Sequence, residues 1–472
     1  MATPSLLESN YLNMRSILCF IFGLWAVAGA EAKIALPSIF SEHMVLQRNT
    51  EVTIWGWGHP GEEITLYTSW NGKEYAFKTS VGAKWEIAVE TPEAGGPFFL
   101  LVRGNSNEIK LQNILIGEVW LCSGQSNMEW SANSGIDNAA DEITQANYPN
   151  IRFFSVDKRA SDGTQDDFSG TWEVCTPDTM QDFSAIAYFF ARKIQSDLGI
   201  PIGLIDASWG ASSAEVWTPA RVFEEHDALK EAAQRIEENP WVTNKPSTLF
   251  NAMIHPITSF KIAGTLWYQG ESNTANADTY QKLFSEMIAA WRSAWGYDFP
   301  FYFVQIAPYS YNKPEQGVLV RDAQRRSLEV PNTGMVVVSD ICTVDDIHPR
   351  NKKDVGLRLA NMALVQQYRT NENKVISGPL FKDMEIYKDK IIVRFHYAQG
   401  LYAKGPILTH FEIAGEDGVF FPAKAVLKED QVWVSSNEVK HPKHVRFAWH
   451  NTAIPNLFNS AGLPASSFRS GL

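Results

Sequence analysis

The sequence predicts a doubly wound α/β domain that lies between two β-rich segments. Over residues 113–374, short apolar runs alternate with amphipathic helical segments, which is typical of a parallel sheet covered by helices. Residues 33–112 and 375–472 instead alternate apolar and polar side chains with the period of half-buried strands. The length of 472 residues also exceeds what one hydrophobic core usually supports, so several domains are expected.

The composition is that of a globular protein and argues against several other classes. Hydrophobic residues make up 45% of the chain and charged residues 20%, which argues against a largely disordered protein. A formal net charge of −12 argues against a protein that wraps nucleic acid or lies on an anionic membrane. Sixteen tryptophans are consistent with sugar-binding surfaces and equally with large β-rich cores.

The first 32 residues have the features of a secretory signal peptide. Arg15 precedes the apolar run 17–28, which is too short to span a bilayer, and Ala-Glu-Ala at 30–32 resembles a cleavage site. Met14 is an alternative start, and a buried helix or membrane anchor is the alternative interpretation of the run. We therefore expect a secreted or periplasmic protein. Cleavage would leave three of the four cysteines, so at most one disulfide can form.

The segment 33–112 predicts a small antiparallel β-sandwich. Val52 and Ile54 alternate with polar neighbours, and Ile64 and Leu66 do the same. The glycines and the proline of residues 56–61 mark a turn between these two runs.

The central segment contains five apolar runs that are typical of buried parallel strands. These runs cover residues 116–122, 202–207, 264–268, 301–306 and 335–338. One helix is expected from Ser184, as N-cap, to Gly199, and a second from about Ala277 to Gly296. A third helix is expected after Pro349.

The segment 375–472 returns to the pattern of strands. Val432 and Val434 flank Trp433, and Val445 alternates with Phe447. The tail, residues 456–469, is rich in Asn, Ser, Pro and Gly, so we expect it to be irregular.

Four residues with catalytic potential each follow a different predicted strand. They are Ser126, Gly210, Asn273 and His348. Because ligands bind beyond the carboxyl ends of strands in open α/β sheets, all four can converge at one edge. Each residue has a simpler explanation alone, as an N-cap, a turn glycine, a capped turn or a capping histidine. Their joint placement favours a functional site.

The residue types match a serine nucleophile with its supporting groups. A serine on a strand-to-helix turn is exposed and is followed by free backbone N–H groups. Gly210 allows close backbone approach, and the Asn273 amide can donate to an oxyanion. His348 is the usual type of base, and Asp345 and Asp346 precede it by three and two residues.

With these motifs, the chain resembles the sialate O-acetylesterase family of SGNH (GDSL-like) hydrolases. The resemblance covers about residues 35–469, and GQSNM at 124–128 with WYQGESN at 267–273 is its most specific signal. It implies a flavodoxin-like, three-layer α/β/α catalytic domain at 113–374, flanked by β-domains at 33–112 and 375–472. It implies no metal and no other cofactor.

The resemblance also assigns roles. Ser126 matches the nucleophile and His348 its base. The backbone N–H groups of Ser126 and Gly210, with the Asn273 amide, match the oxyanion hole. The general pattern places the orienting acid at Asp345. The alternatives for this acid are Asp346, Asp340 and a Ser–His dyad without any acid.

The implied activity is removal of O-acetyl groups from a carbohydrate, with sialic acid as the first candidate. Gln269 and Glu271 are candidates for shaping the acetyl or sugar pocket. Arg321 is a candidate ligand for the carboxylate of sialic acid, or else a charge on a helix surface. The alternatives are an acetylxylan or other polysaccharide deacetylase and a non-catalytic carbohydrate-binding protein. The partner is an acetylated glycan, and no nucleic acid is expected.

Overall fold

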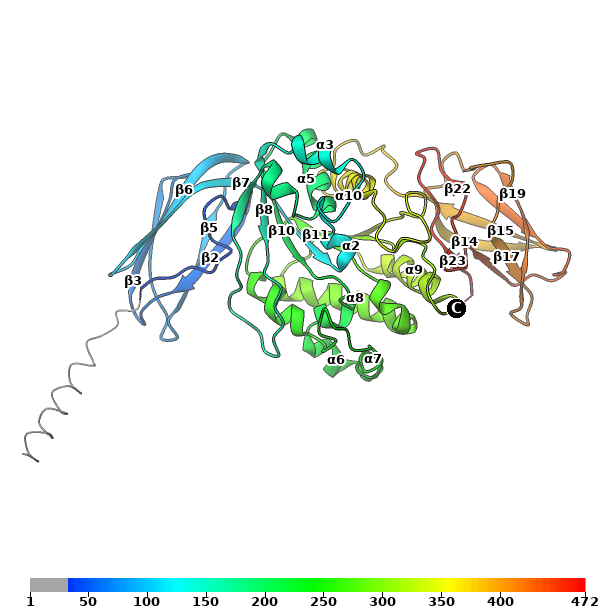
Figure 1. Cartoon of the computed structure of the whole chain (residues 1–472), viewed down its shortest axis with the longest axis horizontal. Helices are drawn as coiled ribbons and strands as arrows, with labels where there is room; N and C mark the ends of the chain where they lie inside the picture. The colour runs from blue at the N-terminus through cyan, green and yellow to red at the C-terminus, as the bar shows by residue number, and fades with distance from the viewer. Residues whose placement is uncertain (1–32, 472) are drawn as a thin grey trace, which may run out of the picture.

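The computed structural model describes residues 33–471, which form a central α/β unit with a β-rich unit at either end (Figure 1). The order of the three units in space is their order along the chain, as the blue, green and red colours show. This confirms the predicted α/β centre with flanking β segments. The predicted signal peptide, residues 1–32, lies outside the described part of the chain. Within residues 33–471, no helix is long and apolar enough to cross a membrane.

The N-terminal unit is built from short, mostly antiparallel strands. They are β1 (Val45–Gln47), β2 (Glu51–Trp57), β3 (Glu63–Thr68), β4 (Lys73–Lys78), β5 (Lys84–Glu90) and β6 (Gly95–Arg103). β2 and β5 form a two-stranded ribbon, while β3 pairs with β4 and β6. Val52, Ile54, Ile64 and Leu66 are all buried, as their alternation predicts, because successive strand residues point to opposite faces.

One long strand, β7 (Glu108–Gly124), belongs to both the N-terminal unit and the central sheet. Its first half pairs antiparallel with β6. Its second half pairs in parallel with β10 (Ile202–Ser208) and β11 (Gly264–Tyr268). The sequence predicted only this second half. The N-terminal unit is therefore attached to the central sheet by a continuous hydrogen-bonded strand.

The central sheet has the strand order β13-β12-β11-β7-β10-β8-β9. The strands not yet placed are β8 (Tyr148–Ser155), β9 (Trp172–Cys175), β12 (Phe301–Val304) and β13 (Thr333–Val336). Neighbouring strands are parallel except β9, which runs antiparallel to β8. The five predicted strands are confirmed with shifts of a few residues at their ends. β8 and β9 were not predicted.

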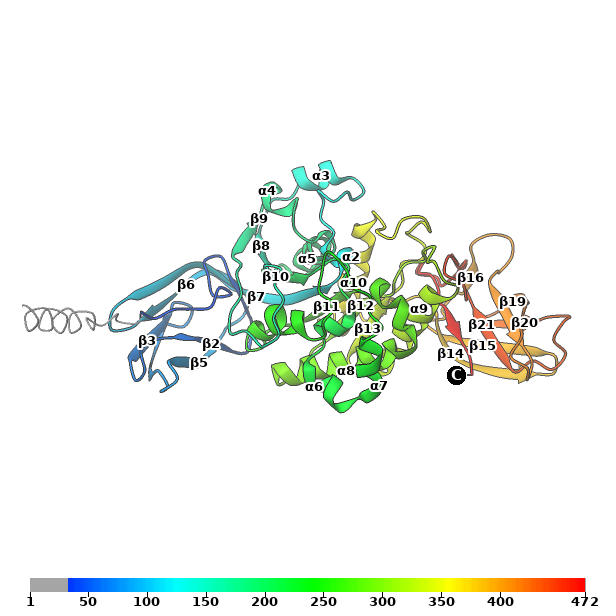
Figure 2. The same cartoon turned by 60° about the horizontal axis from the view of Figure 1, so that its bottom comes forward.

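The three predicted helices are confirmed as α5 (Ala185–Leu198), α8 (Ala277–Trp295) and α10 (Lys352–Gln366). The Ser184 hydroxyl accepts from the Ala187 N–H, and Gly199 ends α5 with a φ of 69°. α5 and α10 lie on one side of the sheet and α8 on the other (Figures 1 and 2). The other helices are α2 (Ser126–Glu129), α3 (Ala139–Thr144), α4 (Pro177–Met180), α6 (Ala220–Glu225), α7 (Asp227–Ala233) and α9 (Gln316–Arg326).

The C-terminal unit contains two four-stranded antiparallel sheets and one two-stranded sheet around a core of its own. One has the order β14 (Leu380–Tyr387), β15 (Lys390–His396), β20 (Gln431–Ser435), β19 (Lys424–Lys428). The other has the order β18 (Phe420–Pro422), β17 (Phe411–Ala414), β21 (His444–Phe447), β23 (Phe468–Arg469). β16 (Tyr402–Ala403) pairs with β22 (Leu457–Phe458). The tail is thus more ordered than predicted, since it supplies β22 and β23.

Arg321 joins the central unit to the C-terminal unit. It lies in α9, is 1% exposed, and its guanidinium donates to the carbonyls of His450 and Asn451 at 2.6 and 3.1 Å. Burial lowers its pKa to about 10. Arg321 is therefore neither a carboxylate ligand in an open cleft nor a helix-surface charge, as the sequence had suggested. Its partners come from a distant segment that no local pattern reveals.

We predict that Arg321→Met destabilises the protein by about 2–4 kcal/mol, because buried carbonyl groups lose their donor. Urea unfolding measures the change. Arg235→Met is the matched control, since Arg235 makes an exposed ion pair with Asp278 and such pairs contribute about 1 kcal/mol or less. Equal stability of the two variants would contradict this role of Arg321.

Candidate active site

Ser126 lies on a tight turn between β7 and α2. Gly124 ends β7 with a φ of 135°, and a Cβ atom at this position would lie 2.2 Å from the Tyr268 carbonyl oxygen. The Gln125 N–H donates to that same carbonyl at 2.9 Å. Only glycine suits Gly124, because the conformation and the close approach both exclude a side chain. The turn leaves Ser126 partly exposed as the first residue of α2.

His348 lies beside Ser126, although 222 positions separate the two residues. Its Nε2 is 2.8 Å from the Ser126 Oγ. The Trp130 indole stacks on the imidazole ring, with centroids 4.2 Å apart and planes 20° apart. An Asp346 carboxylate oxygen accepts from the backbone N–H of His348 at 2.8 Å. Stacking and this backbone contact therefore hold the ring against the serine.

The structure does not place a carboxylate on the imidazole of His348. Asp345, the acid selected by spacing, is exposed, and Asp346 binds only the backbone. Asp340 instead forms an ion pair with Arg358 at 2.6 Å. Across residues 33–471, no carboxylate oxygen makes a hydrogen bond to a ring nitrogen of His348. The geometry is that of a Ser–His pair, one of the alternatives that the sequence left open.

The surroundings of His348 favour its neutral form. Burial and the nearby ammonium group of Lys352 lower the pKa of His348, while Asp346 and Glu129 offset part of this effect. Lys352 is only 1% exposed, and burial lowers its own pKa to about 7. A neutral imidazole can accept a proton, so these effects extend the range in which His348 can act as a base toward lower pH.

A buried polar network lies behind the Ser–His pair and is centred on Asn127. The Asn127 amide donates to Glu271 Oε1 at 2.6 Å and to the Ile347 carbonyl at 2.9 Å. Lys352 Nζ donates to the Asn127 amide oxygen at 2.6 Å. Burial raises the pKa of Glu271 to about 7. The network ties the helix of Ser126 to the loop of His348 and to α10.

Gly210 follows β10 and lies next to the serine. A Cβ atom at Gly210 would be 3.4 Å from the Ser126 Cβ, so the two backbones are neighbours. The Gly210 N–H donates to Glu129 Oε2 at 2.6 Å. The other oxygen of Glu129 pairs with Lys158 Nζ at 2.5 Å. The expected oxyanion donor therefore lies beside Ser126, but it is bound to a carboxylate.

Asn273 and Gln269 are not brought to the same surface. Both are fully buried, and the Asn273 amide donates to Glu215 Oε2 at 2.8 Å. Its amide oxygen accepts from the Ala214 N–H at 2.9 Å and from Gln269 Nε2 at 2.6 Å. These two side chains hold the loop that follows Gly210, instead of facing a ligand. Their dense mutual bonding explains the concentration of amides in this motif.

Ser126 and His348 line a cleft of about 740 Å³. Glu271 reaches its wall, as expected, together with Ser272. Three tryptophans also line it, Trp130, Trp209 and Trp241. Lys158 is the one lysine or arginine among the described residues that line the cleft.

Several of these residues were not predicted from the sequence. Glu129 lies three residues after Ser126, so a helix starting at the serine brings both to one face, and this spacing is a usable signal. Lys352 follows His348 by four residues, but it begins α10 while His348 lies in the loop before this helix, so helical spacing does not place the two together. Lys158 follows β8, and the strand itself was not predicted, so no signal placed this lysine at the same edge.

The chain is similar to known carbohydrate esterases. The family model described as "Carbohydrate esterase, sialic acid-specific acetylesterase" matches residues 116–365. The chain is 31% identical to the sialate O-acetylesterase of Mus musculus over 446 residues, which cover 80% of this chain and 81% of that protein. It is 30% identical to that of Homo sapiens, over 83% of this chain and 82% of that protein.

A solved structure is similar over nearly the whole chain. The crystal structure of a carbohydrate acetylesterase from Xanthomonas citri has a TM-score of 0.85 and 34% identity, and the match covers 93% of this chain and 99% of that one. The family model alone spans more than half of the 472 residues. The chain therefore belongs to the sialic acid-specific acetylesterase family of carbohydrate esterases.

Proposed function

We propose that the protein is a serine esterase that removes O-acetyl groups from sialic acid, with Ser126 as nucleophile and His348 as base. The observation that carries this proposal is the 2.8 Å hydrogen bond between His348 Nε2 and Ser126 Oγ in an open cleft. A hydroxyl paired with a neutral imidazole is an activated nucleophile, for which simple sugar binding has no need. Because the chain belongs to a family of acetylesterases, the bond that Ser126 attacks is proposed to be an acetyl ester.

The reaction proceeds in two halves. His348 Nε2 takes the proton of Ser126 as Oγ attacks the acetyl carbonyl carbon, and the imidazolium then protonates the departing sugar oxygen. A water molecule next gives its proton to His348 and attacks the acetyl-serine. The return of that proton to Ser126 Oγ releases acetate. The low pKa of His348 keeps the imidazole ready to accept a proton in both halves.

Two backbone N–H groups are proposed to stabilise the oxyanion, those of Ser126 and Gly210. Ser126 begins α2, so its N–H has no acceptor in a preceding helical turn. The Gly210 N–H becomes available when Glu129 moves away, because the carboxylate and an oxyanion cannot share the donor. Asn273 contributes as a positioning residue, since it fixes Ala214 and hence the loop of Gly210.

Lys158 is proposed as the cation that recognises the carboxylate of sialic acid. It lines the cleft, pairs with Glu129, and its side chain is 43% exposed. It takes the role that the sequence had suggested for Arg321. A neutral acetylated sugar, such as acetylated xylan, would gain nothing from this charge. A contribution of Lys158 to substrate binding therefore distinguishes activity on sialic acid from deacetylation of neutral polysaccharides.

The finer organisation of the chain is also proposed. We infer a signal peptide at residues 1–32 and hence a secreted or periplasmic protein. We also infer β-domains at 33–112 and 375–472 and a three-layer SGNH hydrolase domain at 113–374. Helices on both sides of the parallel sheet support the layering (Figure 2). The first boundary falls within β7, which passes from one unit to the next.

Ser126→Ala is expected to lower the kcat of acetate release from O-acetylated sialic acid by about 10⁴-fold or more, because the nucleophile is lost. Asp345→Asn is the control and should stay within about threefold of the parent enzyme, since Asp345 is exposed and makes no hydrogen bond to His348 in the described structure. Turnover by purified Ser126→Ala at the parent rate would refute the proposed mechanism.

Lys158→Met should raise the KM for acetylated sialic acid about 10-fold or more, because a charge-assisted hydrogen bond to the substrate is lost. The KM for an acetylated xylo-oligosaccharide should change much less, and this comparison corrects for any displacement of Glu129. Lys245→Met, at another exposed lysine, is the matched control. Equal effects on both substrates would argue against recognition of a carboxylate.

Lys352→Met should move the acid limb of the kcat/KM profile to higher pH by roughly half to one unit. Removing the ammonium group raises the pKa of His348 toward its ordinary value, so the base becomes protonated at a higher pH. Lys353→Met is the control, because the side chain of Lys353 is half-exposed and pairs with Glu142. An unchanged profile, or a shift to lower pH, would contradict this electrostatic coupling.

A further inference from the structure

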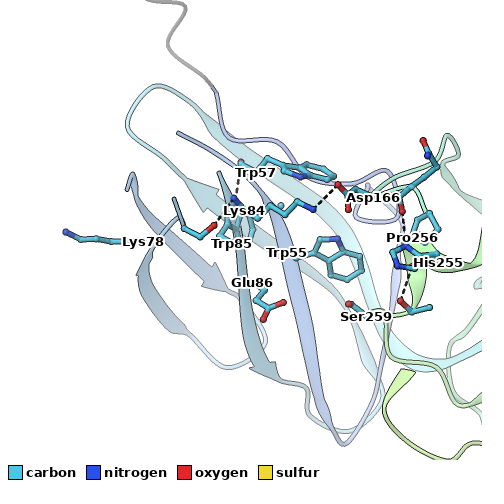
Figure 3. Close-up of a pocket in the computed structure, with 14 residues that line it drawn as sticks. Trp55, Trp57, Lys78, Lys84, Trp85, Glu86, Asp166, His255, Pro256 and Ser259 are labelled. Atoms are coloured by element: carbon cyan, nitrogen blue, oxygen red, sulfur yellow. Dashed lines mark hydrogen bonds and ion pairs between the residues drawn. The ribbon is translucent and has the colours of Figure 1, made fainter. Parts of the chain in front are cut away.

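A second concavity, of about 540 Å³, lies between the N-terminal unit and the central unit (Figure 3). One wall is the ribbon of β2 and β5. The other wall consists of Gln165 and Asp166 and of the segment 255–259, which precedes β11. None of these residues belongs to the active-site cleft.

The ribbon presents two tryptophans to this concavity. In β2, Val52 and Ile54 point into the core of the N-terminal unit, whereas Trp55 and Trp57 lie on the opposite face and are half-buried. Figure 3 shows both indoles on the side of β2 that faces the central unit. Partly exposed tryptophans that line a concave surface are candidates for contact with a ligand.

Packing within the protein accounts only in part for these two side chains. Trp85 fills the adjacent core and is 5% exposed, and Gly56 permits this because any Cβ there would press on the Trp85 ring. Trp55 packs with part of its surface against the main core and meets the edge of Phe40, with centroids 4.6 Å apart. Trp57 stacks on no aromatic ring within residues 33–471. In that same range, neither indole N–H of β2 makes a hydrogen bond.

Polar groups surround the two indoles on the same face. Register places Glu86 opposite Trp55 and Lys84 opposite Trp57, and directly opposed residues share a face. Lys84 Nζ pairs with Asp166 at 2.8 Å, and both side chains are more than half exposed. Such exposed pairs add little to stability, so these groups remain free to bind hydroxyls.

We propose that this concavity is a second carbohydrate-binding site that holds a pyranose ring of a glycan. The apolar face of a sugar ring matches an indole, and its hydroxyls match the mixed donors and acceptors of Lys84, Asp166 and Glu86. Charges of both signs argue against a polyanion. The many polar groups of the walls argue against a lipid.

The proposed site is remote from Ser126. Residues 255–259 precede β11 at the amino edge of the sheet, whereas Ser126 lies at the carboxyl edge. The five residues of β11 separate these edges by about 17 Å. A monosaccharide therefore reaches one site only, while a longer or branched glycan is held near the active site by the other. The inference rests on the proposed esterase function only for the choice of glycan.

Binding tests the site directly in the full chain carrying Ser126→Ala, which prevents turnover. Xylohexaose and 3′-sialyllactose are titrated separately by calorimetry, so that the two arms distinguish a neutral plant glycan from a sialylated one. We expect saturable binding of at least one probe. Addition of Trp57→Ala should weaken it about 10-fold or more, whereas Trp57→Tyr should retain most of it. Trp433→Ala, at a half-buried tryptophan of the C-terminal unit, should leave binding unchanged.

Thermal unfolding checks that each variant is folded, and Glu86→Gln replaces Trp57→Ala if the latter is not. Failure of both probes to show binding that depends on Trp57 or Glu86 would overturn the proposal.

Kinetic measurements on the active enzyme, in which Ser126 is unchanged, distinguish this site from the esterase function. Trp57→Ala should leave acetate release from monomeric O-acetylated sialic acid unchanged, and should raise the KM for an acetylated polymer or glycoprotein severalfold. An equal loss on the monomer would place Trp57 in catalysis and contradict a separate site. Absence of acetate release by the parent enzyme would refute the esterase proposal, while the binding result would still decide this one.

Discussion

The active site depends on the close approach of two neighbouring strands at their carboxyl ends. Gly124 ends β7 with its α-carbon against the Tyr268 carbonyl, where no side chain fits. The Gln125 N–H then bonds to that carbonyl and locks the two strand ends together. The chain after β7 therefore turns at once and presents Ser126, while the chain after β11 places Glu271 against Asn127. The position of Ser126 and the buried network behind it both follow from this one contact.

The two flanking units are attached by different means, and this affects what each can do. β7 continues from the N-terminal unit into the central sheet, so backbone hydrogen bonds fix their relative position. The concavity at Trp55 and Trp57 is therefore preformed, which lowers the entropic cost of binding a ligand there. The C-terminal unit is held by side chains such as Arg321 and Gln305, whose amide bonds to Ser466 at 2.8 Å. A backbone hydrogen bond from the Tyr309 N–H to the Asn451 carbonyl, at 3.1 Å, adds to them.

The elements of the fold were predictable where the signals are local. Ser184 and Gly199 mark the ends of α5 because capping involves only neighbouring residues. β7 was half-predicted since its environment changes along its length: the first part is half-buried in an antiparallel pair, and the second is buried on both faces. β8 was missed because a short apolar run at the end of a polar loop does not by itself identify a strand, and pairing with β10 decides it.

The sequence by itself determined that Ser126 and His348 follow strands of one sheet, and strand topology alone brings such residues to the same edge. Only the tertiary structure decided what surrounds them. Asp345 has the expected spacing but lies in water, whereas Lys352 is buried close enough to shift the pKa of the histidine. Arg321 finds acceptors 129 and 130 positions away in the chain. The role of a polar side chain depends on which distant groups share its burial, and no local pattern contains that information.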